Sequence, residues 1–155
     1  RYLTGKLNGY ITGAYIYNKM GLTEQVATTI TIATPNPVRR FRFKNLDIEC
    51  VKAYCMVYPD ESLVPYLRLL DAIKDMKRIP GTTGQDIYNR VKSQYFNGYS
   101  LPELEKIVSL AKSYPPRVRK VVADILGDIR QTVLQTEMAK TILPTTRFNL
   151  DYKTA

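Results

Sequence analysis

Apolar positions recur with two different periods along the chain, and the change of period divides it in two. After one short helical segment, and up to about Ala53, apolar residues mostly alternate with polar ones, as in half-buried strands. From about Ser62 to Leu143 they recur every three or four residues, as on one face of a helix. Strand segments followed by a run of helical segments predict the α+β class, not an alternating βαβ arrangement.

The first pattern, residues 9–34 (GYITGAYIYNKMGLTEQVATTITIAT), predicts a short helix followed by a strand. Thr12 is suited to cap a helix that runs to Met20, and Gly21 is suited to the left-handed conformation that ends it. From Thr28 onward, β-branched residues dominate and favour a strand. These residues include no nucleophile paired with a base, so their composition indicates a structural rather than a catalytic role.

Two further alternating segments, 38–44 and 46–53, flank Asn45 and predict a hairpin. With the preceding strand they predict a small antiparallel β-meander. A two-residue turn at Lys44 and Asn45 sets apolar residues opposite apolar ones and cations opposite carboxylates. The predicted pairs are Phe43 with Leu46, Phe41 with Ile48, Arg42 with Asp47, and Arg40 with Glu49.

The helical half is predicted from apolar stripes that begin just after capping residues. Pro115 and Pro116 end one helix and start another, and Gly127 lies inside that last run as either a break or a tolerated interior glycine. The predicted starts are Ser62 for a helix over 63–76, Thr82 with Gln85 for a helix ending near Asn97-Gly98, and Ser100 with Glu103 for the next. We expect residues 1–143 to form a single α+β domain and residues 144–155 to form a polar tail.

Composition narrows the functional classes without selecting one. The chain has 155 residues, no histidine, a net charge of +9 and two cysteines, Cys50 and Cys55. Two cysteines without histidine or a CxxC pair predict free thiols, and neither a disulfide scaffold nor a zinc site. No apolar run approaches the ~18 residues of a membrane span. Without a triad, a phosphate loop or a convergent acid–base set, we predict no enzyme, no metal and no cofactor.

The positive charge permits binding to nucleic acid or to an acidic protein surface. Arg40, Arg42 and Lys44 share one face of the predicted basic strand and are candidates for phosphate contacts. The hairpin register offers the two arginines carboxylate partners instead, and we favour this ion-pair interpretation. Arg39 lies on the opposite face, where the ion pairs do not explain it.

Three more cations, Arg117, Arg119 and Lys120, open the helix that follows the two prolines. Cations at a helix N-terminus oppose the macrodipole, so a phosphate or carboxylate of a partner could compensate them. A solvated face, with Asp124 four residues after Lys120 as its ion-pair partner, explains them equally well. Both interpretations stay open for these residues.

Two other patterns are weaker. Asp47, Glu49 and Lys52 have part of the pattern of a metal-dependent nuclease strand, but alternation places Glu49 and Lys52 on opposite faces, and we reject this reading. Twelve tyrosines could stack on bases, but in the absence of tryptophan they are more typical of core edges.

The residues of the first pattern also carry a family resemblance. The chain resembles the C-terminal domain of AbiEi-type antitoxins, transcriptional regulators of bacterial type IV toxin–antitoxin systems that act in abortive infection. The one departure within the motif is Ala27, where the family usually has proline. The matching residues are Tyr10, Thr12-Gly13, Gly21-Leu22-Thr23, Gln25-Val26 and the strand over 30–34.

The resemblance implies a cytoplasmic antitoxin and transcriptional autoregulator that represses its own operon. It also implies that the protein counteracts a nucleotidyltransferase-like toxin, without necessarily forming a stable complex with it. DNA would be bound mainly by a winged helix-turn-helix domain upstream of Arg1, so we expect weak DNA binding by this chain alone. The alternative is a basic nucleic-acid-binding module that acts through its charge. For either function the candidate contacts are Arg39, Arg40, Arg42, Arg117, Arg119 and Lys120.

Overall fold

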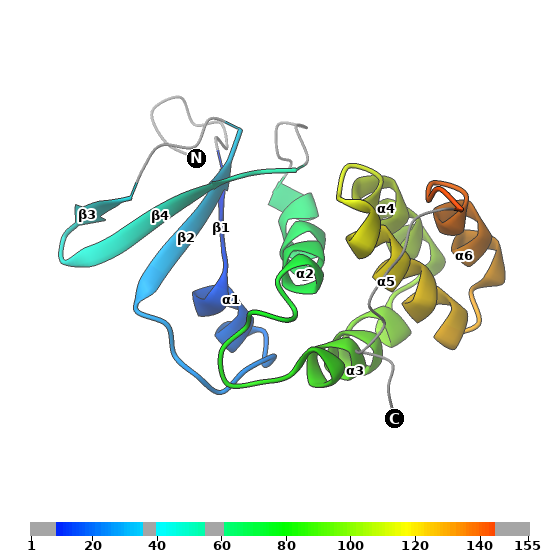
Figure 1. Ribbon diagram of the computed structural model, residues 1–155, viewed down its shortest axis with the longest axis horizontal. Helices are drawn as coiled ribbons and strands as arrows, with labels where there is room; N and C mark the ends of the chain where they lie inside the picture. Colours follow the sequence, from blue (N-terminus) through cyan, green and yellow to red (C-terminus); the bar gives the residue numbers. More distant parts are fainter. Residues whose placement is uncertain (1–8, 36–39, 55–60, 145–155) are drawn as a thin grey trace.

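The computed structural model describes residues 9–35, 40–54 and 61–144, in which strands precede a helical C-terminal half (Figure 1). This confirms the predicted α+β class. The first elements are β1 (Tyr10–Thr12), α1 (Ala14–Lys19), β2 (Thr29–Thr34), β3 (Phe41–Phe43) and β4 (Leu46–Lys52). The helices that follow are α2 (Val64–Lys74), α3 (Gly84–Gln94), α4 (Leu101–Ala111), α5 (Pro116–Asp128) and α6 (Thr132–Ala139).

The four strands form one mixed sheet in the order β1-β2-β4-β3. β1 pairs with β2 and β3 pairs with β4 in antiparallel fashion, but β2 and β4 are parallel. The prediction of a purely antiparallel meander was therefore wrong. The longer and more apolar β4 takes the interior position, and the short, charged β3 takes the edge, where charged side chains discourage pairing with other chains.

The predicted β3–β4 hairpin is confirmed in register and turn. Phe41 pairs with Ile48 and Phe43 with Leu46. Lys44 and Asn45 have φ values of 50° and 66°, as a two-residue turn of the type favoured in hairpins requires. The predicted ion pairs also form, with 3.6 Å between Arg42 Nε and Asp47 Oδ1 and 3.2 Å between Arg40 and Glu49.

Thr12 does not cap α1 as predicted. It ends β1, and Gly13 stands at the N-cap of α1 with no side-chain hydrogen bond. The hydroxyl of Thr12 donates instead to Asp71 of α2. Gly21 has the predicted positive φ, 78°, after the helix ends.

The helix starts were predicted with mixed success. The capping box of Ser100 and Glu103 is confirmed, and α5 begins at Pro116 as expected. The prediction for Thr82 was wrong by one residue, because Thr83 is the N-cap and accepts from the Asp86 backbone amide at 3.1 Å. The prediction for Ser62 was also wrong: α2 begins at Val64 and has Leu63 in its N-cap position.

The last helical run divides into α5 and α6. Gly127 lies inside α5 as a tolerated glycine, and the break follows at Arg130, whose φ is 66°. The buried side chains of the helices join those of Tyr10, Ile16, Tyr17 and Leu22 in one apolar cluster. Within residues 9–35, 40–54 and 61–144, no helix combines the length and the apolar character needed to cross a membrane.

One face of the sheet is turned toward α1 and α2. Thr12, Thr31 and Glu49 point from neighbouring strands toward the end of α2, where they line a cavity together with residues of that helix. α1 and α2 contact the β1–β2 part of the sheet. The β3–β4 hairpin extends beyond this contact, away from the helices (Figure 1).

Candidate functional site

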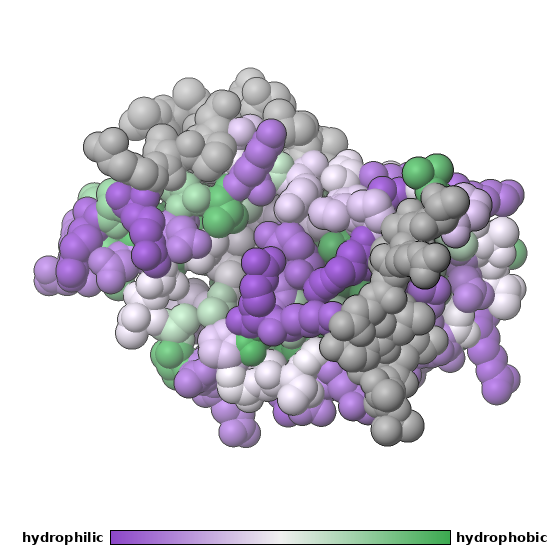
Figure 2. Space-filling view, in the orientation of Figure 1, coloured by the Kyte–Doolittle hydropathy of each residue, from purple (hydrophilic) through white to green (hydrophobic). Residues whose placement is uncertain are grey.

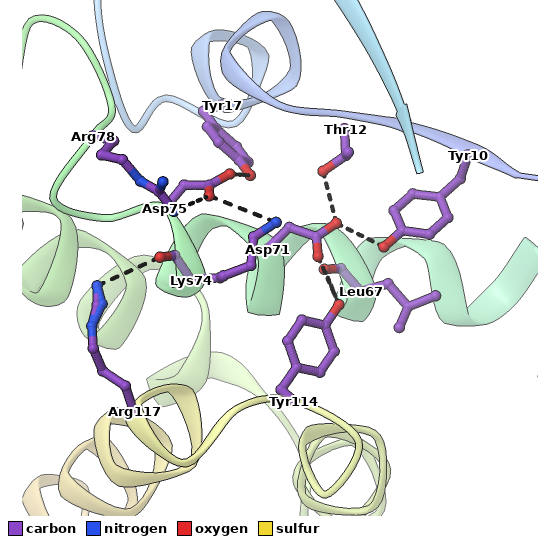
Figure 3. A network of polar contacts seen from close by, with 10 residues as sticks. All are labelled: Tyr10, Thr12, Tyr17, Leu67, Asp71, Lys74, Asp75, Arg78, Tyr114 and Arg117. Atoms are coloured by element: carbon purple, nitrogen blue, oxygen red, sulfur yellow. Dashed lines mark hydrogen bonds and ion pairs between the residues drawn. The ribbon is translucent and has the colours of Figure 1, made fainter. Parts of the chain in front are cut away.

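A buried carboxylate at the centre of the molecule joins the sheet to the helices. Asp71 of α2 is 3% exposed and accepts three hydrogen bonds, all from hydroxyl groups (Figure 3). Tyr10 and Thr12 of β1 donate to Oδ2 at 2.7 and 2.8 Å, and Tyr114, just before α5, donates to Oδ1 at 2.7 Å. The carboxylate therefore holds three separate parts of the chain together.

Burial raises the pKa of the Asp71 carboxyl, because the charged form loses its hydration. The hydrogen bonds from Tyr10, Tyr114 and Thr12 oppose this effect, since hydroxyl donors stabilise the carboxylate. Burial, followed by the negative charge of Asp71, likewise raises the pKa of the Tyr114 hydroxyl. Tyr114 is thus a hydrogen-bond donor at every physiological pH, which suits a structural role.

A second, more open cluster lies one helical turn further along α2. The hydroxyl of Tyr17 in α1 donates to Asp75 Oδ2 at 2.8 Å. The other oxygen, Oδ1, lies 3.7 Å from Lys74 Nζ and 3.6 Å from an Arg78 nitrogen. Burial, and then the charge of Asp75, raises the pKa of the Tyr17 hydroxyl, which therefore stays protonated.

The cavity between the sheet and the end of α2 has a volume of about 360 Å³. Two carboxylates, Glu49 and Asp75, and two cations, Lys74 and Arg78, line it together with Tyr17. Figure 2 shows that hydrophilic side chains also cover the surface over the end of α2. Asp75 is already engaged by Tyr17 and two cations, and Glu49 by Arg40. Both acids of the cavity therefore have charged partners.

Metal binding has no visible support in the part of the chain that the structure describes. Nowhere in it are three or more His, Cys, Asp or Glu side chains grouped as metal ligands. Cys50 is a free thiol, and Cys55 lies outside the described residues. The predicted lack of a metal or cofactor stays a prediction.

Within residues 9–34, the part around Gly21 contacts α3 and the segment that precedes α3. Leu22 is completely buried. The hydroxyl of Thr23 donates to the Pro80 carbonyl at 2.6 Å. Arg90 donates to the Gly21 carbonyl at 3.1 Å, and the hydroxyl of Tyr95 donates to the Met20 carbonyl at 2.7 Å. This part of the chain is therefore held by polar groups on α3 and on the segment between α2 and α3.

The cations predicted on the basic strand do not point to an open phosphate site. Arg40 and Arg42 are paired with Glu49 and Asp47, although their side chains remain 70% and 67% exposed. Arg42 also donates to the Asn45 carbonyl across the turn at 3.4 Å. Arg39 lies outside the described residues.

The three cations at the start of α5 also contact the protein itself. Arg119 donates to the carbonyls of Tyr114 and Thr141. Arg117 approaches the Lys74 carbonyl at the end of α2, at 3.5 Å (Figure 3). Lys120 forms an ion pair with Asp124 at 3.1 Å, as the interpretation of these residues as a solvated face predicts. The structure does not bring these residues together with Arg40 and Arg42 into one surface patch.

Sequence reasoning did not find Asp71 and Asp75. A signal for Asp71 was present, because it lies four residues after Leu67 and so on the inner face of α2. A carboxylate at an inward-facing helical position predicts buried hydrogen-bond donors nearby. No family model, no curated protein sequence and no solved structure matches this chain.

Proposed function

We propose that this chain is the antitoxin domain of a type IV toxin–antitoxin system. In this proposal it takes part in repressing its own operon and counteracts a nucleotidyltransferase-like toxin in the cytoplasm. The observation that carries the proposal is the presence of Tyr10, Thr12-Gly13 and Gly21-Leu22-Thr23 in the pattern of AbiEi-type antitoxins.

The contacts of these residues support the proposal by giving the pattern a physical reason. Tyr10 and Thr12 hold β1 on α2 through Asp71, and Thr23 holds the next segment on Pro80. Gly13 and Gly21 have φ values of 81° and 78°, which glycine adopts without strain. Residues with such contacts are needed for the fold. The antitoxin function itself is inferred from the resemblance.

A non-catalytic role is part of the proposal. Asp71, the most buried carboxylate among the described residues, already has a hydroxyl donor on each oxygen and lies away from solvent. The carboxylates that line the cavity are paired with cations. These arrangements stabilise a structure, whereas a catalytic acid or base needs access to a substrate proton.

The proposal is tested by growth rescue. The gene that neighbours this protein's gene is expressed from an inducible promoter in a bacterial host, with or without the chain. We expect that gene to encode a nucleotidyltransferase-like protein that stops growth, and co-expression of the chain to restore it. Leu22→Asp places a charge in the core and should abolish rescue, whereas Val133→Ala, at a position 79% exposed, should preserve it. A folded, well-expressed chain that gives no rescue contradicts the proposal.

The basic nucleic-acid-binding module stays an alternative prediction. The described cations on which it was based have partners within the protein, so no described contact specifically favours it through those residues, and Arg39 lies outside the described residues.

A further inference from the structure

The β3–β4 hairpin carries apolar and charged side chains on opposite faces. Side chains that pair across two strands point to the same face, so Phe41, Phe43 and Leu46 lie together on one face. Arg42 and its partner Asp47 lie on the other.

The charged face is the one turned toward the helices. Glu49 alternates with Ile48 along β4 and lies on the charged face, where it lines the cavity beside α2. Phe41, Phe43 and Leu46 therefore point away from α1 and α2. We call these three residues, together with Lys44 at the turn, the outer hairpin face.

The apolar side chains of the outer hairpin face are about half exposed to solvent. Phe41 is 45% exposed, Phe43 57% and Leu46 47%, and they are neighbours on two paired strands. Scattered apolar residues are normal on a protein surface, whereas contiguous exposed ones are candidates for a binding surface. The part of the sheet that projects from the helices thus presents two aromatic rings to solvent.

The cations on this side of the hairpin lie at the turn and at the far end of β4. Lys44 Nζ lies 5.4 Å from the centroid of the Phe43 ring. Lys52 is exposed and follows Leu46, Ile48 and Cys50 on the same side of β4 by strand alternation. Both carboxylates of the hairpin, Asp47 and Glu49, lie on the opposite face with the arginines. The outer hairpin face therefore combines aromatic rings with a cation at the turn, and a second cation lies further along β4 on the same side, an arrangement that suits an extended anionic ligand.

A second copy of this chain is a poor occupant for this surface. Edge-to-edge pairing of β3 would place Arg40, Arg42 and Lys44 against the same cations of the copy. The net charge of +9 on each copy adds to this repulsion.

We propose that the outer hairpin face binds single-stranded nucleic acid, with bases stacked on Phe41 and Phe43 and phosphates beside Lys44 and Lys52. The two rings are two residues apart on one strand, which separates their Cα atoms by roughly 7 Å. An extended single strand with unstacked bases can bridge this distance. Single strands expose base faces to aromatic side chains, whereas a duplex hides them. The proposal does not depend on the antitoxin function.

The test is fluorescence anisotropy of the full chain with a labelled oligothymidylate of about 12 nucleotides. We expect it to bind more tightly than a duplex of the same length. Phe41→Ala/Phe43→Ala should weaken binding by about tenfold or more, since each ring stacks one base. Both side chains are about half exposed and lie in an edge hairpin, so circular dichroism should show that the variant keeps the fold.

Conservative variants separate stacking from a general apolar contact. Phe41→Tyr/Phe43→Tyr keeps the rings and should retain binding. Phe41→Leu/Phe43→Leu keeps apolar bulk and should lose it nearly as fully as the alanine variant.

Charge is tested with two matched pairs. Lys44→Gln/Lys52→Gln should make the dependence of log K on log salt shallower by about 1.4, as expected for two phosphate contacts of a single strand. Lys106→Gln/Lys140→Gln removes two exposed cations of α4 and the end of α6 and should leave that slope unchanged.

Three outcomes overturn the proposal. One is equal affinity for duplex and single strand that the alanine variant does not change, because charge alone then explains binding. Another is retention of binding by the leucine variant. The third is concentration-dependent dimerisation in sedimentation that Phe41→Ala/Phe43→Ala abolishes, because the outer hairpin face would then belong to a second copy.

Discussion

Gly13 stands between β1 and α1 with a φ of 81°, a conformation that other residues adopt only with strain. An added Cβ would lie 2.6 Å from Thr31 Oγ1 and 2.7 Å from Thr31 Cβ on the neighbouring strand. The glycine therefore allows the chain to turn sharply into the helix while the two strands stay paired.

Gly13→Ala should lower the free energy of unfolding by about 3 kcal/mol, because backbone strain and overlap with Thr31 act together. The matched control is Gly98→Ala, where a Cβ meets nothing within 4 Å, and we expect a change within about 0.5 kcal/mol. Urea denaturation of the two variants measures this difference. Equal effects would mean that the close approach to Thr31 does not matter.

At the scale of single elements, α3 shows how one residue decides where a helix begins. Thr83 accepts a hydrogen bond from the Asp86 amide, whereas the hydroxyl of the adjacent Thr82 is buried without a hydrogen-bond partner among the described residues. The two threonines differ in role although they are neighbours of identical chemistry.

Thr83→Ala should therefore cost about 1 kcal/mol of stability, as for other N-caps. Thr82→Ala should be close to neutral, since it removes a buried hydroxyl that makes no hydrogen bond. Thermal unfolding of the two variants tests the assignment. A larger loss at Thr82 would restore the capping position that the sequence spacing predicts.

Local patterns predicted the elements whose signals lie within a few residues. The hairpin register follows from pairing Phe41 with Ile48 and Arg42 with Asp47. The start of α4 follows from the capping box of Ser100 and Glu103. The parallel pairing of β2 with β4 could not be predicted in this way, because it depends on which strand buries more apolar surface. β1 has only three residues, too few for a periodic signal.

The candidate site was less predictable than the fold. The sequence gives Asp71 a place on the inner face of α2, but not its partners, which lie 61, 59 and 43 positions away. The exposure of Phe41 and Phe43 was hidden for a similar reason. Alternation places them on one face, but only the position of the helices decides whether that face is covered.

At the scale of the whole molecule, the sheet and the helices meet at a polar junction. Asp71 lies at its centre, and its hydroxyl partners come from the sheet and from the segment before α5 (Figure 3). A buried carboxylate is costly unless hydrogen bonds satisfy it, so the donors and the acceptor depend on one another. The central claim is that Tyr10 and Thr12, the polar residues of β1, have a structural role: they hold the sheet on α2 by donating to Asp71.

A double-mutant cycle between Tyr10→Phe/Thr12→Val and Asp71→Ala tests this claim most directly. If the two hydroxyls act through Asp71, the cycle should give a coupling free energy of about 3 kcal/mol or more, the sum of two buried hydrogen bonds to a charged acceptor. A parallel cycle between Tyr88→Phe and Asp71→Ala should give a coupling near zero, because the hydroxyl of Tyr88 donates to Asp128. A coupling near zero in the first cycle would contradict the account, because Tyr10 and Thr12 would then not stabilise the protein through Asp71.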